Sequence, residues 1–290
     1  FNANRLIQSF EVADITPNPT ARLAAKWLEA KLNHTIVEVD RMIANYRVSD
    51  AMMTRYNFIW GDFCSWYLEA VKPAEGEAIS QQTYEATVSA FERMMTLLHP
   101  FMPFITEEVW HDLRDRAEGD DCVVSNWPKA AAYDTNIVKS FTLLQGTVSS
   151  IRDVRNQRNV NKREPLALFV NQSTASERLL GATAGAVEFL KKAGVLKSVE
   201  LTTEAPANAL PFLIGNDKAY VVLNEAIDFE AEKTKINEDI ARLEGQLKGV
   251  TKKLSNERFV SNAPDAVVAM EKKKQADWTA KIASLRAMLG

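Results

Sequence analysis

Hydrophobic residues recur at three- and four-residue intervals through the first part of the chain, which predicts a series of amphipathic helices. Residues 1–10 begin this series, and Thr20 and Ser49 are expected to cap the next two helices. A third helix starts near Ser80, and a short fourth helix follows a break that contains two prolines. Because short connections place successive helices antiparallel, residues 1–116 are predicted to form a helical bundle.

The pattern changes after the bundle. Residues 117–133, which contain a glycine, an acidic pair and a proline, are interpreted as a linker. Residues 134–228 begin with one more long amphipathic helix and continue with short β-like runs, which predicts a small mixed α/β subdomain. The three predicted strands, with a helix between the first two, are residues 166–170, 195–201 and 219–223.

Residues 229–290 carry a hydrophobic seam with alternating three- and four-residue steps, which is typical of a coiled coil. A break at residues 257–263 is followed by Pro264, which suits the first turn of a second helix. Two helices joined by a short loop must fold back on each other, so an antiparallel hairpin, the arm, is predicted. The whole chain is therefore expected to be mainly α. The seam positions are Phe229, Ile236, Ile240, Leu243, Leu247, Val250 and Leu254, followed by Trp278, Ile282, Leu285 and Leu289.

Composition places the chain among ordinary globular proteins, with 46% hydrophobic and 25% charged residues and a formal net charge of -3. It contains no apolar run long enough to span a membrane. Cys64 and Cys122 have no second cysteine or histidine at ligand spacing, which favours a reducing, cytoplasmic setting over a disulfide framework. The chain opens at Phe1 as if inside a helix, which predicts a piece of a longer polypeptide.

Motifs for catalysis or metal binding are few. Glu108 and His111 have the Glu-x-x-His spacing of a di-iron ligand helix, but the spacing occurs once and such sites need it on two helices. No glycine-rich phosphate loop or nucleophile elbow is present in the sequence. We therefore expect no catalytic residue, metal or cofactor in this chain. The aromatic residues from Phe58 to Tyr67 could stack on bases, but their helical spacing favours the core.

Two basic clusters are the candidate polyanion-binding residues. Three arginines of the first cluster step by three along one helix, which favours contact with phosphates or bases because arginine presents a planar fork. The alternative is a solvated helix end, whose cations face the negative pole of the helix dipole. This cluster comprises Arg152, Arg155, Arg158, Lys162 and Arg163.

The second cluster follows from charge polarity along the arm. Residues 229–244 hold five acids and three bases, whereas residues 245–274 hold seven bases and three acids. In a hairpin that turns near residue 260, the cations of both helices meet in the distal half, which favours a polyanionic partner over a mixed, solubilising surface. These cations are Lys248, Lys252, Lys253, Arg258, Lys272, Lys273 and Lys274.

Several stretches resemble a known family. Residues 99–110, HPFMPFITEEVW, resemble the helix break in the anticodon-binding bundle of class I aminoacyl-tRNA synthetases. Residues 60–69, WGDFCSWYLE, are similar to the valyl and isoleucyl forms. Residues 253–260, KLSNERFV, and 263–268, APDAVV, resemble the hairpin turn of the valyl-tRNA synthetase arm, and the similarity extends over essentially the whole chain.

The resemblance implies a parent enzyme that attaches valine to tRNA(Val) using ATP and Mg2+, with its catalytic and editing domains outside this chain. It implies that the bundle holds the anticodon stem-loop and that the arm lies against the tRNA elbow. Alone, the chain is expected to be monomeric and inactive. One alternative is a coiled-coil protein-interaction module. Another is an isoleucyl-tRNA synthetase, whose C-terminus carries a zinc-binding cysteine cluster that two lone cysteines do not provide.

Overall fold

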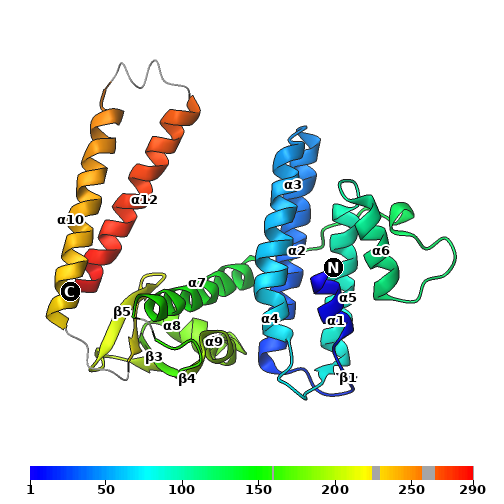
Figure 1. The fold of residues 1–290 in the computed structure, drawn as a ribbon, viewed down its shortest axis with the longest axis horizontal. Helices are drawn as coiled ribbons and strands as arrows, with labels where there is room; N and C mark the ends of the chain where they lie inside the picture. The colour runs from blue at the N-terminus through cyan, green and yellow to red at the C-terminus, as the bar shows by residue number, and fades with distance from the viewer. Residues whose placement is uncertain (159, 224–228, 257–264, 290) are drawn as a thin grey trace. The chain divides into compact units, whose positions relative to one another are not determined.

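The computed structural model describes residues 1–158, 160–223, 229–256 and 265–289 (Figure 1). The chain divides into two compact units, one made of residues 1–165 and 173–199 and the other of residues 166–172 and 200–290. Within the described ranges its elements are mostly helices, with one sheet of two strands and one of four, which confirms the predicted mainly α class. Among the residues described, no helix is both long enough and apolar enough to cross a membrane.

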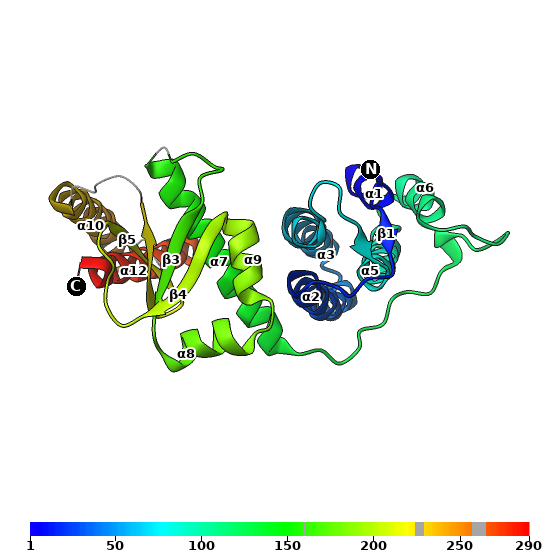
Figure 2. The same cartoon turned by 90° about the horizontal axis from the view of Figure 1, so that it is seen from below.

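The first unit contains the predicted helical bundle, whose helices are seen end-on in Figure 2. Its helix α2 spans Pro19–Ala44, and the cap is Asn18, whose Oδ1 accepts the amide hydrogen of Ala21 at 2.8 Å. The predicted cap at Thr20 was wrong. Pro19 occupies the first helical position, so Asn18 is the residue that caps, and Thr20 is buried inside the first turn.

A second helical run follows the turn at residues 45–47. It consists of α3 (Val48–Tyr56), the π-helical stretch η1 (Asn57–Tyr67) and α4 (Leu68–Val71). The predicted cap at Ser49 was wrong, because Arg47 precedes the helix and Ser49 lies inside its first turn without a capping hydrogen bond. The i→i+5 hydrogen bonds of a π-helix alter which side chains face the core.

The remaining bundle helices agree with the sequence pattern. The helices are α1 (Asn2–Gln8), α5 (Gln81–Leu98) and α6 (Pro103–Leu113), and the short strands β1 (Val12–Ala13) and β2 (Ile79–Ser80) pair in parallel. α5 begins where the sequence predicted, next to Ser80, and Ser80 caps it, its Oγ accepting the Thr83 amide hydrogen at 3.2 Å. Asn4 and Gln8 of α1 donate hydrogen bonds to Asp112 of α6, which ties the first helix to the bundle.

Residues 117–133, predicted as a linker, make specific contacts with the bundle. A single 3-10 turn, η2 (Cys122–Val124), buries Cys122. The Trp127 indole donates to Asp40 at 2.8 Å, and the Ala131 amide donates to Asn33 at 2.8 Å. Because both acceptors lie on α2, hydrogen bonds hold this segment on the helix surface.

The long helix after this segment, α7 (Thr135–Gln157), shares an aromatic core with the bundle. Trp27 of α2 stacks on Phe141 of α7 with ring centroids 4.0 Å apart, and Phe141 packs against Phe189 at 4.8 Å. Phe189 belongs to α9 (Ala186–Gly194), which follows α8 (Thr174–Glu177) and the π-helical η3 (Arg178–Ala182). Gly185, with φ of 91°, separates η3 from α9, so the single helix predicted here is two segments.

The four-stranded sheet has the strand order β4-β3-β6-β5. Its strands are β3 (Leu166–Asn171), β4 (Leu196–Thr202), β5 (Ala209–Ile214) and β6 (Asp217–Val222). β6 lies antiparallel to β3 and β5, and a tight turn containing Gly215, with φ of 61°, joins β5 to β6. The three predicted strands are confirmed as β3, β4 and β6. β5 was missed because it contains Pro211, which a sheet tolerates on an edge strand.

The arm lies in the second unit and consists of α10 (Phe229–Leu254) and α12 (Asp265–Leu289), side by side in Figure 1. Glu244 accepts a hydrogen bond from Arg286 at 2.5 Å, and Thr251 accepts one from Gln275 at 3.2 Å. Higher residue numbers on α10 therefore pair with lower residue numbers on α12, which confirms the predicted antiparallel pairing. The predicted turn at 257–263 and the start at Pro264 lie outside the described residues. The packed seam contains Ile236, Ile240, Leu243, Leu247, Trp278, Ile282 and Leu285.

Candidate nucleic-acid interface

The distal half of the arm gathers lysines from both helices at one height. Glu271 of α12 is 5% exposed and lies between Lys253 and Lys274, at 3.7 Å and 2.8 Å. The hydrogen bond from Lys274, together with the charge of Lys253, lowers the pKa of the Glu271 carboxyl. One acid thus bridges the two helices and neutralises part of the local positive charge.

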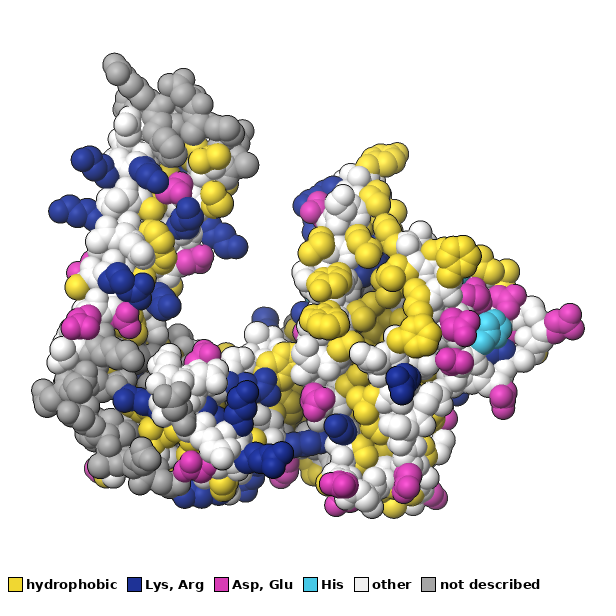
Figure 3. Space-filling view, in the orientation of Figure 1, with side chains coloured by type: hydrophobic (Ala, Val, Ile, Leu, Met, Phe, Trp, Pro, Cys, Tyr) yellow, Lys and Arg dark blue, Asp and Glu magenta, His cyan; other side chains and the backbone are white. Residues whose placement is uncertain are grey.

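Four further lysines in this half remain solvent-exposed. Lys248 and Lys252 lie on α10 and Lys272 and Lys273 on α12, and within the described ranges none of the four has an ion pair. Figure 3 shows basic side chains projecting along the arm. Arg258, also predicted to contact a polyanion, lies outside the described residues. The structure therefore brings together six of the seven predicted arm cations.

Arg155 of the first basic cluster has a structural role. It is 4% exposed, and its guanidinium donates to the carbonyl oxygens of Asn161 at 3.0 Å, Gly194 at 3.1 Å and Val195 at 2.9 Å. Burial lowers the pKa of this guanidinium from its usual value. The predicted single face of three arginines is therefore divided: Arg152 is exposed, Arg155 is buried, and Arg158 is half-buried.

The exposed members of this cluster lie on either side of Arg155 in the sequence. The Arg152 guanidinium lies 5.2 Å from the ring centroid of Trp66 and donates to the Ala193 carbonyl at 3.4 Å. Lys162 and Arg163 are exposed in the turn after α7. Because Arg155 holds the Asn161 carbonyl, it fixes the start of the turn that presents these two cations.

A third basic group was missed by the sequence reasoning. Arg22 and Lys26 of α2 and Arg178 of η3, all exposed, line a pocket of about 500 Å3 in the first unit. Asp134 also lines this pocket, and its Oδ1 accepts the Asn136 amide hydrogen at 2.8 Å. The four-residue spacing of Arg22 and Lys26 was a usable signal, but only the tertiary fold brings Arg178 to them.

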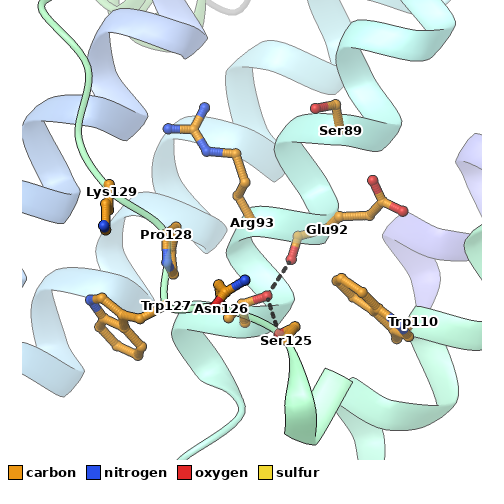
Figure 4. A pocket seen from close by; sticks show the side chains of 10 residues that line it. Ser89, Glu92, Arg93, Trp110, Ser125, Asn126, Trp127, Pro128 and Lys129 are labelled. Atoms are coloured by element: carbon orange, nitrogen blue, oxygen red, sulfur yellow. Dashed lines mark hydrogen bonds between the residues drawn. The ribbon is translucent and has the colours of Figure 1, made fainter. Parts of the chain in front are cut away.

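A larger pocket, of about 810 Å3, lies between α5 and residues 125–129. Figure 4 shows Glu92 and Arg93 of α5 facing this segment, with Trp110 and Trp127 at its two sides. Arg93 is already paired with Glu29 at 2.7 Å. Glu92 accepts hydrogen bonds from Arg114 and Arg116. The two central charges of the larger pocket are thus already paired within the protein. Among the residues that the structure describes, Arg22, Lys26 and Arg178 of the smaller pocket form no ion pair.

Glu107, His111 and Asp121 form a compact cluster whose ligand-type atoms all lie within 4.8 Å of one another. The two Glu107 carboxylate oxygens accept the amide hydrogens of Cys122 at 2.6 Å and Val123 at 3.1 Å. His111 lies 3.0 Å from the Asp121 carboxylate. The cluster therefore joins α6 to the η2 turn through hydrogen bonds.

The aromatic run on the second helical segment is mostly core, as its spacing predicted. Phe58, Phe63 and Tyr67 are at most 2% exposed, and Tyr67 forms a hydrogen bond with Thr87 at 2.7 Å. Burial raises the pKa of the Tyr67 phenol to about 12. Trp60 is the exception, with 64% of its surface exposed.

Comparison with known proteins agrees with this geometry. Residues 25–170 match the anticodon-binding domain of tRNA ligase, and residues 228–290 match the valyl tRNA synthetase tRNA binding arm. The valine–tRNA ligase of Christiangramia forsetii is 38% identical over 291 residues, covering 100% of this chain and 32% of that protein. That of Phocaeicola vulgatus is 40% identical over 288 residues, covering 99% and 32%. That of Fusobacterium nucleatum is 32% identical over 304 residues, covering 100% and 34%.

The two matched regions decide between the alternatives raised by the sequence. The arm matches the valyl form, so an isoleucyl enzyme is not favoured, and the packed seam leaves no need for a partner helix. The chain spans about a third of the length of the relatives it matches. The chain belongs to the anticodon-binding-domain family of tRNA ligases, in the valyl-tRNA synthetase form that carries a tRNA-binding arm.

Proposed function

We propose that this chain is the tRNA-holding part of a valine–tRNA ligase. The parent enzyme attaches valine to tRNA(Val) using ATP and Mg2+ in the cytoplasm, and the rest of its polypeptide supplies the catalytic and editing domains. This chain acts as a monomer and contributes no catalytic residue. Its bundle (residues 1–116) holds the anticodon stem-loop, the subdomain (134–228) braces the arm, and the arm (229–290) lies against the tRNA elbow.

The observation that carries this proposal is that the arm is apolar where its two helices meet and basic on its distal surface. Its apolar seam is filled by its own two helices, so the arm has no unmet need for a protein partner helix. Its distal surface instead presents exposed lysines in a chain whose net charge is -3. A local concentration of cations on an acidic protein is the electrostatic signature of a polyanion-binding site.

The first unit supports the proposal with two further basic groups. Arg152, Lys162 and Arg163 are exposed around the end of α7, and Arg155 positions the turn that carries two of them. The pocket lined by Arg22 and its two neighbouring cations offers a concave site, where an unstacked base or a phosphate fits better than on a convex helix.

The test is a binding series with valine tRNA and an unrelated tRNA at several salt concentrations, made on this chain. In the test variant, six lysines of the distal arm become Gln: Lys248, Lys252, Lys253, Lys272, Lys273 and Lys274. We expect weaker binding of both tRNAs and a flatter salt dependence, since each lost phosphate contact removes about 0.9 from the log–log slope on a duplex.

A control variant changes three of the cations in the proximal half of the arm, Arg242, Lys281 and Arg286, to Gln. Arg242 and Arg286 are paired with Asp239 and Glu244, so they have less free charge to offer a phosphate. The control is expected to keep the wild-type slope. If the distal variant binds valine tRNA as tightly as the wild type at low salt, the arm is not a tRNA grip.

A further inference from the structure

The outer face of the second helical run carries large apolar side chains with no cover. Met53, Tyr56 and Trp60 follow each other at three- and four-residue spacing and are 55%, 49% and 64% exposed. The Tyr56 and Trp60 rings are parallel within 4°, with centroids 6.5 Å apart. The two rings form an exposed, stacked aromatic pair, and Trp60 lies in the π-helical stretch that begins at Asn57, which turns its side chain away from the core.

A second apolar group lies beside it, where α5 ends and α6 begins. Met102 is 45% exposed and Phe104 is 91% exposed. Phe104 lines a pocket of about 530 Å3 together with Val123, which is itself 65% exposed. Hydrophobic side chains gather over the α3 and α6 end of the bundle in Figure 3.

Arg55 links the two groups into one surface. It precedes Tyr56 on α3, and its guanidinium lies 4.7 Å from the ring centroid of Phe101, the residue before Met102. Arg55 is 1% exposed, so it brings no accessible charge to the face. The apolar face is therefore defined as Met53, Tyr56, Trp60, Met102, Phe104 and Val123.

We propose that the apolar face is covered, in the parent enzyme, by the part of the polypeptide that this chain does not include. Contiguous exposed aromatic and aliphatic side chains of this size mark interaction sites on globular proteins. The relatives are about three times as long as this chain, so the parent offers a large body of protein to cover the face. The inference does not depend on tRNA binding by the arm.

The chemistry of the face favours protein over nucleic acid. RNA-binding surfaces combine stacking aromatics with cations that neutralise the phosphate backbone. None of the six side chains of the apolar face is charged, and Arg55 is buried. The pocket that Phe104 and Val123 line carries the acids Glu107, Glu108 and Asp112, which would repel a phosphate backbone. An interface core has the opposite composition, rich in Trp, Tyr, Phe and Met and poor in charge, and the apolar face matches it.

Side-chain oxidation by hydroxyl radicals tests the inference, because Met, Tyr, Trp and Phe are the residues such radicals modify. Oxidation of Trp60, Met102 and Phe104 is compared between this chain and the full-length parent enzyme. We expect it to fall several-fold in the full-length enzyme. Met270 on the arm, which is 53% exposed, serves as the reference residue and should be oxidised equally in both.

A double variant, Trp60→Ser with Phe104→Asp, tests whether the contact stabilises the enzyme. An acid at position 104 suits the first turn of α6, so the melting temperature of this chain should not change, while that of the full-length enzyme should fall. Equal oxidation of the face in both proteins would overturn the inference. So would protection by added tRNA, or a dimer of this chain that the double variant dissociates.

Discussion

Gly185 offers a sharp test of how the α7–α9 region is attached to the bundle. Its backbone has φ of 91°, a conformation that side chains rarely adopt, and it is buried against the start of α2. A Cβ added there would lie 2.2 Å from the carbonyl oxygen of Pro19 and 2.6 Å from its carbonyl carbon. Both are backbone atoms at the capped end of a long helix, so they cannot move aside as a side-chain tip could.

The expected cost of Gly185→Ala follows from two terms. The left-handed conformation costs a non-glycine residue about 1–2 kcal/mol. Overpacking against backbone adds about 1–3 kcal/mol. The smaller entropy of an unfolded alanine chain offsets about 0.4–1 kcal/mol of this sum. The free energy of unfolding of the first unit should therefore fall by about 1–5 kcal/mol, and its Tm by roughly 2–20 °C.

Gly181 is the matched control. It is exposed in η3, and a Cβ there would meet nothing within 4 Å. Because alanine is favoured over glycine inside a helix by about 0.5–1 kcal/mol, Gly181→Ala should be neutral or slightly stabilising. Gly185→Asn separates the two terms, since Asn tolerates the left-handed conformation and still carries the clashing Cβ. It should be nearly as destabilised as the alanine variant.

Tryptophan fluorescence during urea unfolding is the appropriate measurement. Of the six tryptophans, all except Trp278 lie in the first unit, so the signal reports mainly on that unit. If Gly185→Ala proves no less stable than Gly181→Ala, then α9 does not dock on the start of α2, and the shared core of these helices would have to be abandoned.

Two further outcomes follow from buried polar groups. Arg155→Met should lower the free energy of unfolding by about 2–4 kcal/mol, because it leaves three backbone carbonyls without their hydrogen-bond donor. Arg152→Gln, at an exposed position, should change urea unfolding little. Equal effects of the two substitutions would contradict the structural role of Arg155. Folding raises the pKa of Tyr67 from 10.0 to about 12, so the folded state is stabilised by its preference for the neutral phenol. This stabilisation is complete below pH 10 and is lost as pH rises towards 12. Between these pH values, urea unfolding followed by circular dichroism should show that the free energy of unfolding of the wild type falls by about 2–3 kcal/mol more than that of Tyr67→Phe. Equal losses in the two proteins would disprove this role of Tyr67.

Local periodicity was sufficient to predict most of the helices and the pairing of the arm. The arm seam repeats from Ile236 to Leu247 and from Trp278 to Leu285, and its buried members Ile240, Leu243 and Ile282 are those that the spacing selects. The errors at helix starts have a local cause as well. A proline at the first helical position makes the residue before it the cap, so Asn18 was readable as the cap in preference to Thr20.

Burial of charge could not be predicted in the same way. Arginines spaced by three look alike in the sequence, yet Arg155 is enclosed by carbonyls from residues 194 and 195, some forty positions away. A chain turn at Val195, with φ of 53°, directs those carbonyls toward it. The exposure of Trp60 was not predicted for a different reason. An α-helical wheel does not describe which side chains of a π-helical stretch face the core.

The arm and the first unit should contribute differently to recognition if the arm grips tRNA as proposed. Lysines on the arm are mobile point charges on a convex helix surface, so they attract any phosphate backbone alike. Selection among tRNAs must then arise in the first unit, where cations from distant segments converge on a pocket that can hold an unstacked base. Arg22→Gln with Lys26→Gln should therefore change the ratio of affinities for valine tRNA and an unrelated tRNA, whereas the arm variant should weaken both equally. Competition binding at one salt concentration measures this ratio, and an unchanged ratio would remove the pocket from tRNA selection.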